Sequence, residues 1–171
     1  MNQDSISFLQ EPELFRDLTA EQIRELIDIS RRVTFHAGET IMREGEEGDT
    51  LYIILDGTVE VVKSLILPGM EEDDAMDKSK VFTHLGAQDH AVFGEIALLE
   101  KQKRTATITA LTDCVLYEIR KDDFLRLAEE DTALGYRVAL NLARIVSTRL
   151  RKADEDTIKL TTALSIILKQ T

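Results

Sequence analysis

The stretch EGEEGDTLYIILDGTVEVV, Glu44–Val62, decides the fold of this chain. It holds two short runs of β-branched, aromatic and other apolar residues, and Gly45, Gly48 and Gly57 stand at the ends of these runs. β-Branched and aromatic residues favour strands, and glycines favour the turns between them. The stretch therefore predicts two consecutive strands joined by a tight turn.

The same texture extends on both sides of this stretch, over residues 33–119. Short β-branched runs alternate with turn residues, and no helical segment is long enough to connect parallel strands. We predict a mainly β fold with flanking helices, built on an antiparallel β-roll of the jelly-roll type. The predicted strands are VTFH, TIM, TLYIIL, TVEVV, KVFTHL, TATITAL and CVLYEI.

Apolar residues at helical spacing predict helices on both flanks of the roll. An N-terminal helix is expected over 14–32, with Thr19 and Gln22 as a capping box. C-terminal helices are expected over 121–152, with Gly135 near their junction. Together with the roll they would complete one domain.

That domain is expected to span residues 1–152, and a helical tail would follow over 153–171. The tail carries Leu160, Leu164, Ile167 and Leu168 at spacings that place them on one stripe of a helix. Such a stripe suits docking onto another protein or dimerisation.

The composition is that of an acidic chain with an ordinary apolar content. The 171 residues include 32 acidic and 21 basic side chains, which give a formal net charge of −11, and 43% are hydrophobic. This charge argues against nucleic-acid binding, which needs a basic surface. No stretch reaches the roughly 20 consecutive apolar residues of a membrane span, and a single cysteine, Cys114, fits a reducing compartment. We expect a cytoplasmic protein.

The segment FGEIALLEKQKRTATITA, Phe93–Ala110, carries the chemistry. Gly94 lets the backbone approach a ligand, and the N–H groups that open the turn at Glu95–Leu98 are donors for an anion. Arg104 can bring a permanently charged guanidinium to the same place. The carboxylate of Glu95 suits a hydroxyl donor. The segment therefore predicts a ligand with a phosphate and a ribose hydroxyl, as in a cyclic nucleotide.

Phe93–Ala110 resembles the phosphate-binding cassette of the cyclic-nucleotide-binding domain family, which includes the catabolite activator protein and the regulatory subunits of cyclic-nucleotide-dependent kinases. Glu44–Val62 is similar to the glycine-punctuated strands of that family, and the tripeptide RTA at Arg104–Ala106 matches its cassette. The resemblance runs from Leu14 to about Lys152. It implies a regulatory module that binds cAMP or cGMP, has no catalytic activity and uses no catalytic cofactor.

The resemblance also implies roles for individual residues. Arg104 would bind the exocyclic phosphate oxygens, and Glu95 would bind the ribose 2′-hydroxyl. The Thr105 hydroxyl would lie beside the phosphate, and Val61 would touch the base. Backbone contacts to the cyclic phosphate are expected at Gly94, Ile96, Ala97 and Ala106.

Two departures from the family pattern lie close to this cassette. The turn before it, Leu85–Glu95, is longer than in many members and contains His90. Lys103 stands where the family often has a proline, and it adds positive charge near the predicted phosphate site. Farther away, residues 65–80 form an acidic stretch that is longer than a hairpin needs, which predicts a solvated surface loop.

The resemblance suggests how a signal would leave the module. The ligand would order the turn at Glu95–Leu99, whose apolar side chains press on the C-terminal helices, and Gly135 would let these helices swing. Arg149 and Lys152 are candidates for a side chain that caps the base. The receiver would be a protein partner, or a second copy of the chain.

Two alternatives stay open at this level. Arg104 and Glu95 could form a buried ion pair in a scaffold protein whose relic pocket binds no nucleotide. His36, His84 and His90 leave open a cupin-like metalloprotein, although no HxH pair with a following glutamate is present, and we predict no metal.

Overall fold

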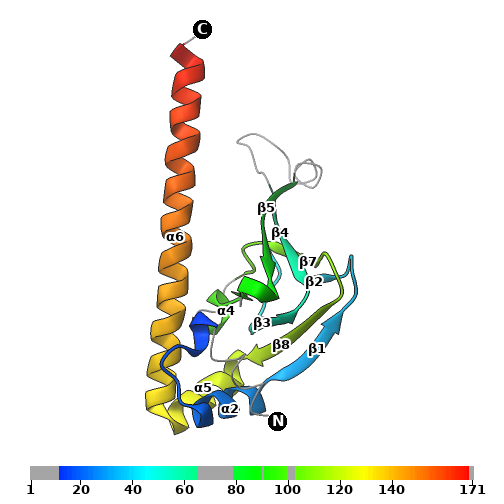
Figure 1. The fold of residues 1–171 in the computed structure, drawn as a ribbon, viewed down its shortest axis with the longest axis vertical. Coiled ribbons are helices and arrows are strands. Elements are labelled where there is room, and N and C mark those ends of the chain that lie inside the picture. The colour runs from blue at the N-terminus through cyan, green and yellow to red at the C-terminus, as the bar shows by residue number, and fades with distance from the viewer. Residues whose placement is uncertain (1–11, 65–78, 90, 100–102, 170–171) are drawn as a thin grey trace.

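The computed structural model describes residues 12–64, 79–89, 91–99 and 103–169 (Figure 1). The acidic stretch at 65–80 lies almost entirely outside the described residues, and so does His90. The helices are η1 (Glu13–Phe15), α2 (Ala20–Asp28), η2 (Ala87–Asp89), α4 (Ile96–Leu99), α5 (Lys121–Glu130) and α6 (Thr132–Lys169). The strands are β1 (Arg31–Phe35), β2 (Thr40–Met42), β3 (Thr50–Asp56), β4 (Thr58–Ser64), β5 (Ser79–Gly86), β6 (Val92–Phe93), β7 (Thr107–Ala110) and β8 (Cys114–Arg120).

The strands form two four-stranded sheets with the orders β1-β8-β3-β6 and β2-β7-β4-β5. Every recorded pairing is antiparallel. This confirms the predicted β-roll with flanking helices. The two-residue strand β6 was not predicted, because a strand this short has no periodicity of its own.

Two apolar clusters stabilise this arrangement. One lies between the sheets, where inward residues such as Val59, Ile108 and Leu116 are at most 2% exposed. The other joins the helices to the base of the roll and includes Phe15 and Leu142. The helices therefore cover the end of the roll that lies near β3 and β6.

The N-terminal helix differs from the prediction of one helix over 14–32. The structure divides this segment into η1, a link that contains Asp17 at φ 62°, and α2. A left-handed residue ends the first turn, and Thr19 then starts a new helix. The predicted capping box is confirmed, because Thr19 Oγ1 accepts from the Gln22 N–H at 3.2 Å while Gln22 Oε1 accepts from the Thr19 N–H at 3.1 Å.

The C-terminal helices are α5 and a single long α6 of 38 residues. The carboxylate of Asp131 accepts from the N–H groups of Ala133 and Leu134 and so caps the start of α6. α6 passes residue 152 without a break and extends far beyond the roll (Figure 1). The division at residue 152 into a domain and a tail therefore stays a prediction.

The near part of α6, residues 132–152, packs closely on the rest of the molecule. Asn141, which is 1% exposed, donates to the carbonyl oxygens of Leu14 at 3.0 Å and Arg16 at 2.7 Å. Gly135 lies against α5, since a Cβ built on it would be 2.7 Å from the Ala128 Cβ. The close packing of α6 on α5 therefore requires this glycine. Its role at a hinge stays a prediction. None of the helices in the described ranges is long and apolar enough to span a bilayer.

Candidate functional site

The second residue of the predicted cassette is a glycine with a positive φ. Gly94 follows β6 with φ 73°, a conformation that side-chain-bearing residues rarely adopt. A Cβ there would lie 2.7 Å from the carbonyl oxygen of Thr50 and 2.8 Å from Nη1 of Arg104. Gly94 is therefore required both by its backbone angle and by the two groups packed against it.

Arg104 lies buried beside this glycine, with 9% of its surface exposed. Its Nη1 donates to the Thr50 carbonyl oxygen at 2.8 Å, and its Nη2 donates to Thr50 Oγ1 at 2.7 Å. Gly48 also packs against the guanidinium, because a Cβ on it would lie 2.1 Å from Nε of Arg104. Two glycines and one threonine thus determine where this cation sits.

The backbone of Arg104 is fixed as well. Its N–H donates to the Glu46 carbonyl oxygen at 2.8 Å, and its carbonyl oxygen accepts from the Gly45 N–H at 2.9 Å. The glycine-punctuated turn before β3 therefore holds the cassette arginine. These two hydrogen bonds join Glu44–Val62 and Phe93–Ala110 in one site.

The described side-chain partners of Arg104 carry no charge. Among the described residues its side-chain partners are two neutral oxygens of Thr50, and no carboxylate is paired with it. A guanidinium has five N–H donors, and a buried cation is stabilised strongly by a negative partner. The arrangement can bind a phosphate.

Glu95 is also buried, and its partner comes from α6. Its Oε1 lies 2.6 Å from Nη1 of Arg149, with the Glu95 side chain 7% exposed. Nη2 of Arg149 donates to the carbonyl oxygen of Val92. α6 is thus tied to β6 and to the residue that starts the cassette turn.

The contact between Glu95 and Arg149 corrects one detail of the scaffold alternative, the buried ion pair between Glu95 and Arg104. The structure gives the two groups different partners, Arg149 and Thr50. Sequence analysis named Arg149 only as a candidate cap for the base. Its contact with Glu95 had no sequence signal, because the two residues are brought together by packing of α6 on the roll.

The other predicted site residues divide between interior and surface. Ala97 and Ala106 are 4% exposed and Val61 is 9% exposed, whereas Ile96 is 36% exposed and Thr105 lies at the surface. Val61 and Ala106 share the cluster between the sheets. The N–H of Ala97 donates to the Gly94 carbonyl oxygen at 3.1 Å, within the turn.

An aromatic pair that sequence analysis did not single out lies near the cassette. Tyr52 and Phe93 stack with ring centroids 5.1 Å apart, and the Tyr52 hydroxyl donates to Glu118 at 3.0 Å. Burial raises the pKa of Tyr52, so the phenol stays protonated at neutral pH. The stack fixes the strand from which Gly94 follows.

The histidines and the cysteine have ordinary structural surroundings. His36 lies 3.5 Å from Asp113, and His84 lies 3.4 Å from Glu60, both toward solvent. Cys114 is buried, and burial raises the pKa of its thiol. Within the ranges that the structure describes, no three His, Cys, Asp or Glu side chains gather as metal ligands.

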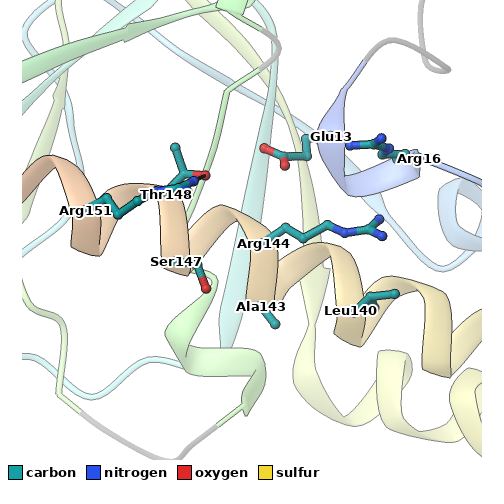
Figure 2. Close-up of a pocket in the computed structure, with 8 residues that line it drawn as sticks. All are labelled: Glu13, Arg16, Leu140, Ala143, Arg144, Ser147, Thr148 and Arg151. Carbon is teal, nitrogen blue, oxygen red and sulfur yellow. Dashed lines mark hydrogen bonds between the residues drawn. The ribbon is translucent and has the colours of Figure 1, made fainter.

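A cavity of about 410 Å³ lies away from the cassette (Figure 2). It is an open groove between η1 and α6, and its lining includes Arg16, Arg144, Arg151, Ser147 and Thr148. Arg144 lies 3.8 Å from Asp17, and Glu13 also lines the groove, so much of its positive charge is balanced. No predicted site residue borders it.

Comparison with known proteins identifies the family. Residues 32–131 match the model of the cyclic nucleotide-binding domain. The chain belongs to this family. The matched residues of this cyclic nucleotide-binding domain include all strands of the roll except the first residue of β1. They also include Gly94, Glu95 and Arg104, and they end at the Asp131 cap.

Two curated relatives illustrate the range of the family. The domain is 36% identical over 122 residues to the cAMP-dependent protein kinase regulatory subunit of Dictyostelium discoideum, covering 70% of this chain and 34% of that one. It is 31% identical over 128 residues to cGMP-dependent protein kinase, isozyme 1, of Drosophila melanogaster, covering 73% of this chain and 15% of that one. The chain thus spans about a third or less of these relatives.

Solved structures agree on the fold. The crystal structure of the Thermus thermophilus catabolite activator protein matches with a TM-score of 0.71 and 27% identity, over 87% of this chain and 63% of that chain. A cAMP-bound PfPKA-R (141–441) matches with a TM-score of 0.60 and 31% identity, over 74% and 42%. The cyclic nucleotide-binding domain fold therefore includes most of the described residues.

Proposed function

We propose that the chain binds a cyclic nucleotide, cAMP or cGMP, and acts as a regulatory module without catalysis. The observation that carries this proposal is the buried guanidinium of Arg104, whose described partners are neutral oxygens. A cyclic phosphate would supply a negative charge, which the described partners of this guanidinium do not. The protein's overall negative charge opposes this weakly, because charges more than about 8 Å away are screened at physiological salt.

The cassette turn would complete the phosphate site. Gly94 lies against the guanidinium. Backbone groups of Gly94, Ile96, Ala97 and Ala106 would contact the phosphate, and the Thr105 hydroxyl would approach from the surface. Each charge-assisted hydrogen bond contributes about 1.5–3 kcal/mol. A handful of them is enough for micromolar affinity, roughly −8 kcal/mol.

The ribose 2′-hydroxyl would bind Glu95, and the base would lie toward Val61. Glu95 is already paired with Arg149 in this structure. The hydroxyl and Arg149 would therefore compete for one carboxylate, so the ligand would weaken the attachment of α6 to the cassette. This gives the expected swing of the C-terminal helices a specific contact through which it starts.

The signal would then pass to another protein chain through α6. The kinase-associated relatives are named as regulated by cAMP in one case and by cGMP in another, which supports either nucleotide as the ligand. The alternative is a scaffold that keeps the roll and binds no nucleotide. The contacts that Thr50 and Arg149 already make with the two charged groups would suit such a scaffold.

Calorimetric titration with cAMP, cGMP and linear 5′-AMP tests the proposal. We expect heat from at least one cyclic nucleotide at micromolar concentration and a much weaker response to 5′-AMP. Arg104→Ala should lower the affinity about 100-fold, because it removes charged donors from the phosphate. Arg126→Ala, at an arginine whose side chain is 64% exposed, is the matched control and should bind like the unmodified chain. No heat from either cyclic nucleotide would favour the scaffold.

Gly48→Ala gives a second test of the same site. The added methyl group would displace the guanidinium of Arg104, which should lower nucleotide affinity about tenfold. Gly38→Ala is its control, since a Cβ there meets nothing within 4 Å and only the backbone at φ 88° is strained. An equal effect of the two variants on affinity would contradict the role assigned to Arg104.

Amide hydrogen exchange tests the coupling. Saturating nucleotide should change exchange in residues 130–152, where α6 meets the cassette through Arg149. Unchanged exchange in that segment, in a sample that binds nucleotide, would show that binding does not reach α6.

A further inference from the structure

A series of hydrogen bonds begins at the buried Arg104 guanidinium and runs through β3 to β8. Nη2 of Arg104 donates to Thr50 Oγ1 at 2.7 Å. On the same strand as Thr50, the Tyr52 hydroxyl donates to Glu118 Oε1 at 3.0 Å. A hydrogen bond between the Thr50 and Tyr52 side chains joins these two contacts. The four side chains, called the relay below, are those of Arg104, Thr50, Tyr52 and Glu118.

The geometry of the strands brings the relay together. Thr50 and Tyr52 are two residues apart on β3, so they lie on the same face of the sheet. Glu118 is opposite Tyr52 in the antiparallel pairing of β3 with β8. Arg104 comes from the cassette and also donates through Nη1 to the Thr50 carbonyl oxygen at 2.8 Å. Three of the four relay residues are thus held by the regular strands of the roll.

The direction of each hydrogen bond follows from the two ends of the relay. A guanidinium can only donate, and a carboxylate can only accept. Thr50 Oγ1 therefore accepts from Arg104, and the single hydrogen of this hydroxyl is left for Tyr52, whose own hydrogen goes to Glu118. Hydroxyls in such a chain polarise one another, so each becomes a better acceptor. The relay therefore turns a lone pair of Thr50 toward the guanidinium.

Burial and the pKa of Tyr52 agree with this direction. Tyr52 is 6% exposed and Arg104 is 9% exposed, so water competes little for their hydrogen bonds. Burial raises the pKa of Tyr52, and the hydrogen bond with Thr50 opposes that rise, which is the effect of a donor on a phenol oxygen. The nearby Glu118 carboxylate raises this pKa as well. Tyr52 therefore keeps its hydrogen at neutral pH and continues to donate to Glu118.

We propose that Tyr52 is a positioning residue for Arg104, and that with Glu118 as its acceptor it fixes the guanidinium through Thr50. The inference rests on the proposed function and adds the residues that hold the phosphate-binding cation in one orientation. In this role Tyr52 does not touch the nucleotide. A side chain that is ordered before the ligand arrives loses less freedom on binding, so the relay would raise the affinity for nucleotide.

Tyr52 also has a packing role, which the test must separate from the role of its hydroxyl. Its ring stacks on Phe93 with centroids 5.1 Å apart. Tyr52→Phe keeps this ring and removes the hydrogen bonds to Thr50 and Glu118. Urea unfolding curves of this variant and of the other variants below confirm that each is folded.

Calorimetric titration with cAMP and cGMP gives the first test. Tyr52→Phe should lower the affinity for the nucleotide that the unmodified chain binds about fivefold, because one end of the Arg104 fork is held less firmly. Tyr117→Phe is the matched control, since Tyr117 is also on β8 beside Glu118 but packs on the apolar cluster that joins the helices to the roll. This control should bind like the unmodified chain. Equal affinities of Tyr52→Phe and the unmodified chain would overturn the role of Tyr52.

A double-variant cycle shows whether Tyr52 acts through Thr50. Thr50→Val removes the hydroxyl but keeps the β-branched shape, so adding Tyr52→Phe to it should change the affinity by less than about twofold. Thr50→Ser keeps the hydroxyl, and in that background Tyr52→Phe should still lower the affinity about fivefold. The same loss from Tyr52→Phe in both backgrounds would show that Tyr52 acts by packing, which contradicts the relay.

Nuclear magnetic resonance of the chain without nucleotide measures the positioning itself. Rotation about the Nε–Cζ bond exchanges Nη1 and Nη2 of Arg104, and the hydrogen bonds to Thr50 slow this rotation. Tyr52→Phe and Glu118→Ala should each speed it about threefold or more, whereas Tyr117→Phe should not. Equal rates in all these chains would overturn the relay. Faster rotation in the two relay variants, with no nucleotide binding by the unmodified chain, would support the relay and overturn the proposed function alone.

Discussion

The near part of α6, residues 132–152, and its outer part, residues 153–169, carry similar apolar patterns in opposite surroundings. In the near part Leu134, Val138 and Leu142 are at most 1% exposed, whereas in the outer part Leu160 and Leu164 are more than half exposed. The near part packs on η1, α5 and the roll. The outer part extends past the roll into open space (Figure 1).

This difference shows what a helical stripe does and does not establish. The spacing of apolar residues indicates that a face will be covered, but it does not indicate which chain covers it. In the near part the cover comes from the same domain, and in the outer part the described residues stay exposed. Variants placed in the two parts should therefore respond to different measurements.

The largest difference is expected between Leu142→Ala and Leu164→Ala. Leu142 is fully buried, so its truncation should lower the free energy of unfolding by about 2–5 kcal/mol. Leu164 is 57% exposed, so its truncation should change that free energy by less than about 0.5 kcal/mol. Urea unfolding followed by circular dichroism measures both, and equal losses would remove the distinction between the two parts.

Gly135→Ala should destabilise the near part by about 1–2 kcal/mol through overpacking. In an exposed helix the same change would stabilise. Here the added Cβ would lie 2.7 Å from the Ala128 Cβ and 3.1 Å from its Cα. Ala128→Gly in the same chain should restore much of the loss, measured by the same unfolding curves. A stabilised single variant would show that α5 and α6 separate more easily than the packing suggests.

Arg149→Ala tests the contact at the boundary between the two parts. If Arg149 competes with the ribose for Glu95, its removal should tighten nucleotide binding about fivefold, a modest effect because the side chain is partly exposed. Arg151→Ala is the control, since Arg151 contacts Thr148 at 3.3 Å and not the cassette. Weaker binding in Arg149→Ala, measured by calorimetry, would assign Arg149 to the ligand itself.

The smallest effect concerns the start of α6. Hydrogen bonds from the Gln22 amide, and then from the Leu134 N–H, lower the pKa of Asp131 below its ordinary value of 3.8. A carboxylate with a lowered pKa in the folded state stabilises at neutral pH, and this contribution is lost as the pH falls through that lower value. Asp131→Asn keeps an N-cap, so it should melt close to the unmodified chain at pH 7 and show a flatter decline in Tm below about pH 4. If Tm declined equally with falling pH in Asp131→Asn and in the unmodified chain, the charge of Asp131 would make no contribution to stability.

Much of the fold was accessible from local pattern. The predicted strands correspond to seven of the eight strands in the described ranges, since their β-branched runs and glycine turns are local signals. The predicted helix over 14–32 was too long, because the left-handed Asp17 interrupts an apolar spacing that continues through it. A single residue with an unusual backbone angle leaves no periodic trace.

The residues of the candidate site could be predicted from the sequence, but the groups that contact their side chains could not. Gly94, Glu95 and Arg104 are recognisable as one motif, and the structure places Gly94 against the guanidinium. The groups that hold the charged side chains, Thr50 and Arg149, come from distant segments. Their contacts depend on how the sheets and α6 pack.

The sequence by itself determined the β-roll, the glycine-supported cassette and the acidic character of the chain, because these follow from neighbouring residues and from composition. Only the tertiary structure decided that Glu95 pairs with Arg149, that Arg104 contacts Thr50, and that the described side chains of the outer part of α6 are exposed. Contacts between segments far apart in the chain are set by the packing of whole elements, and no local pattern records them.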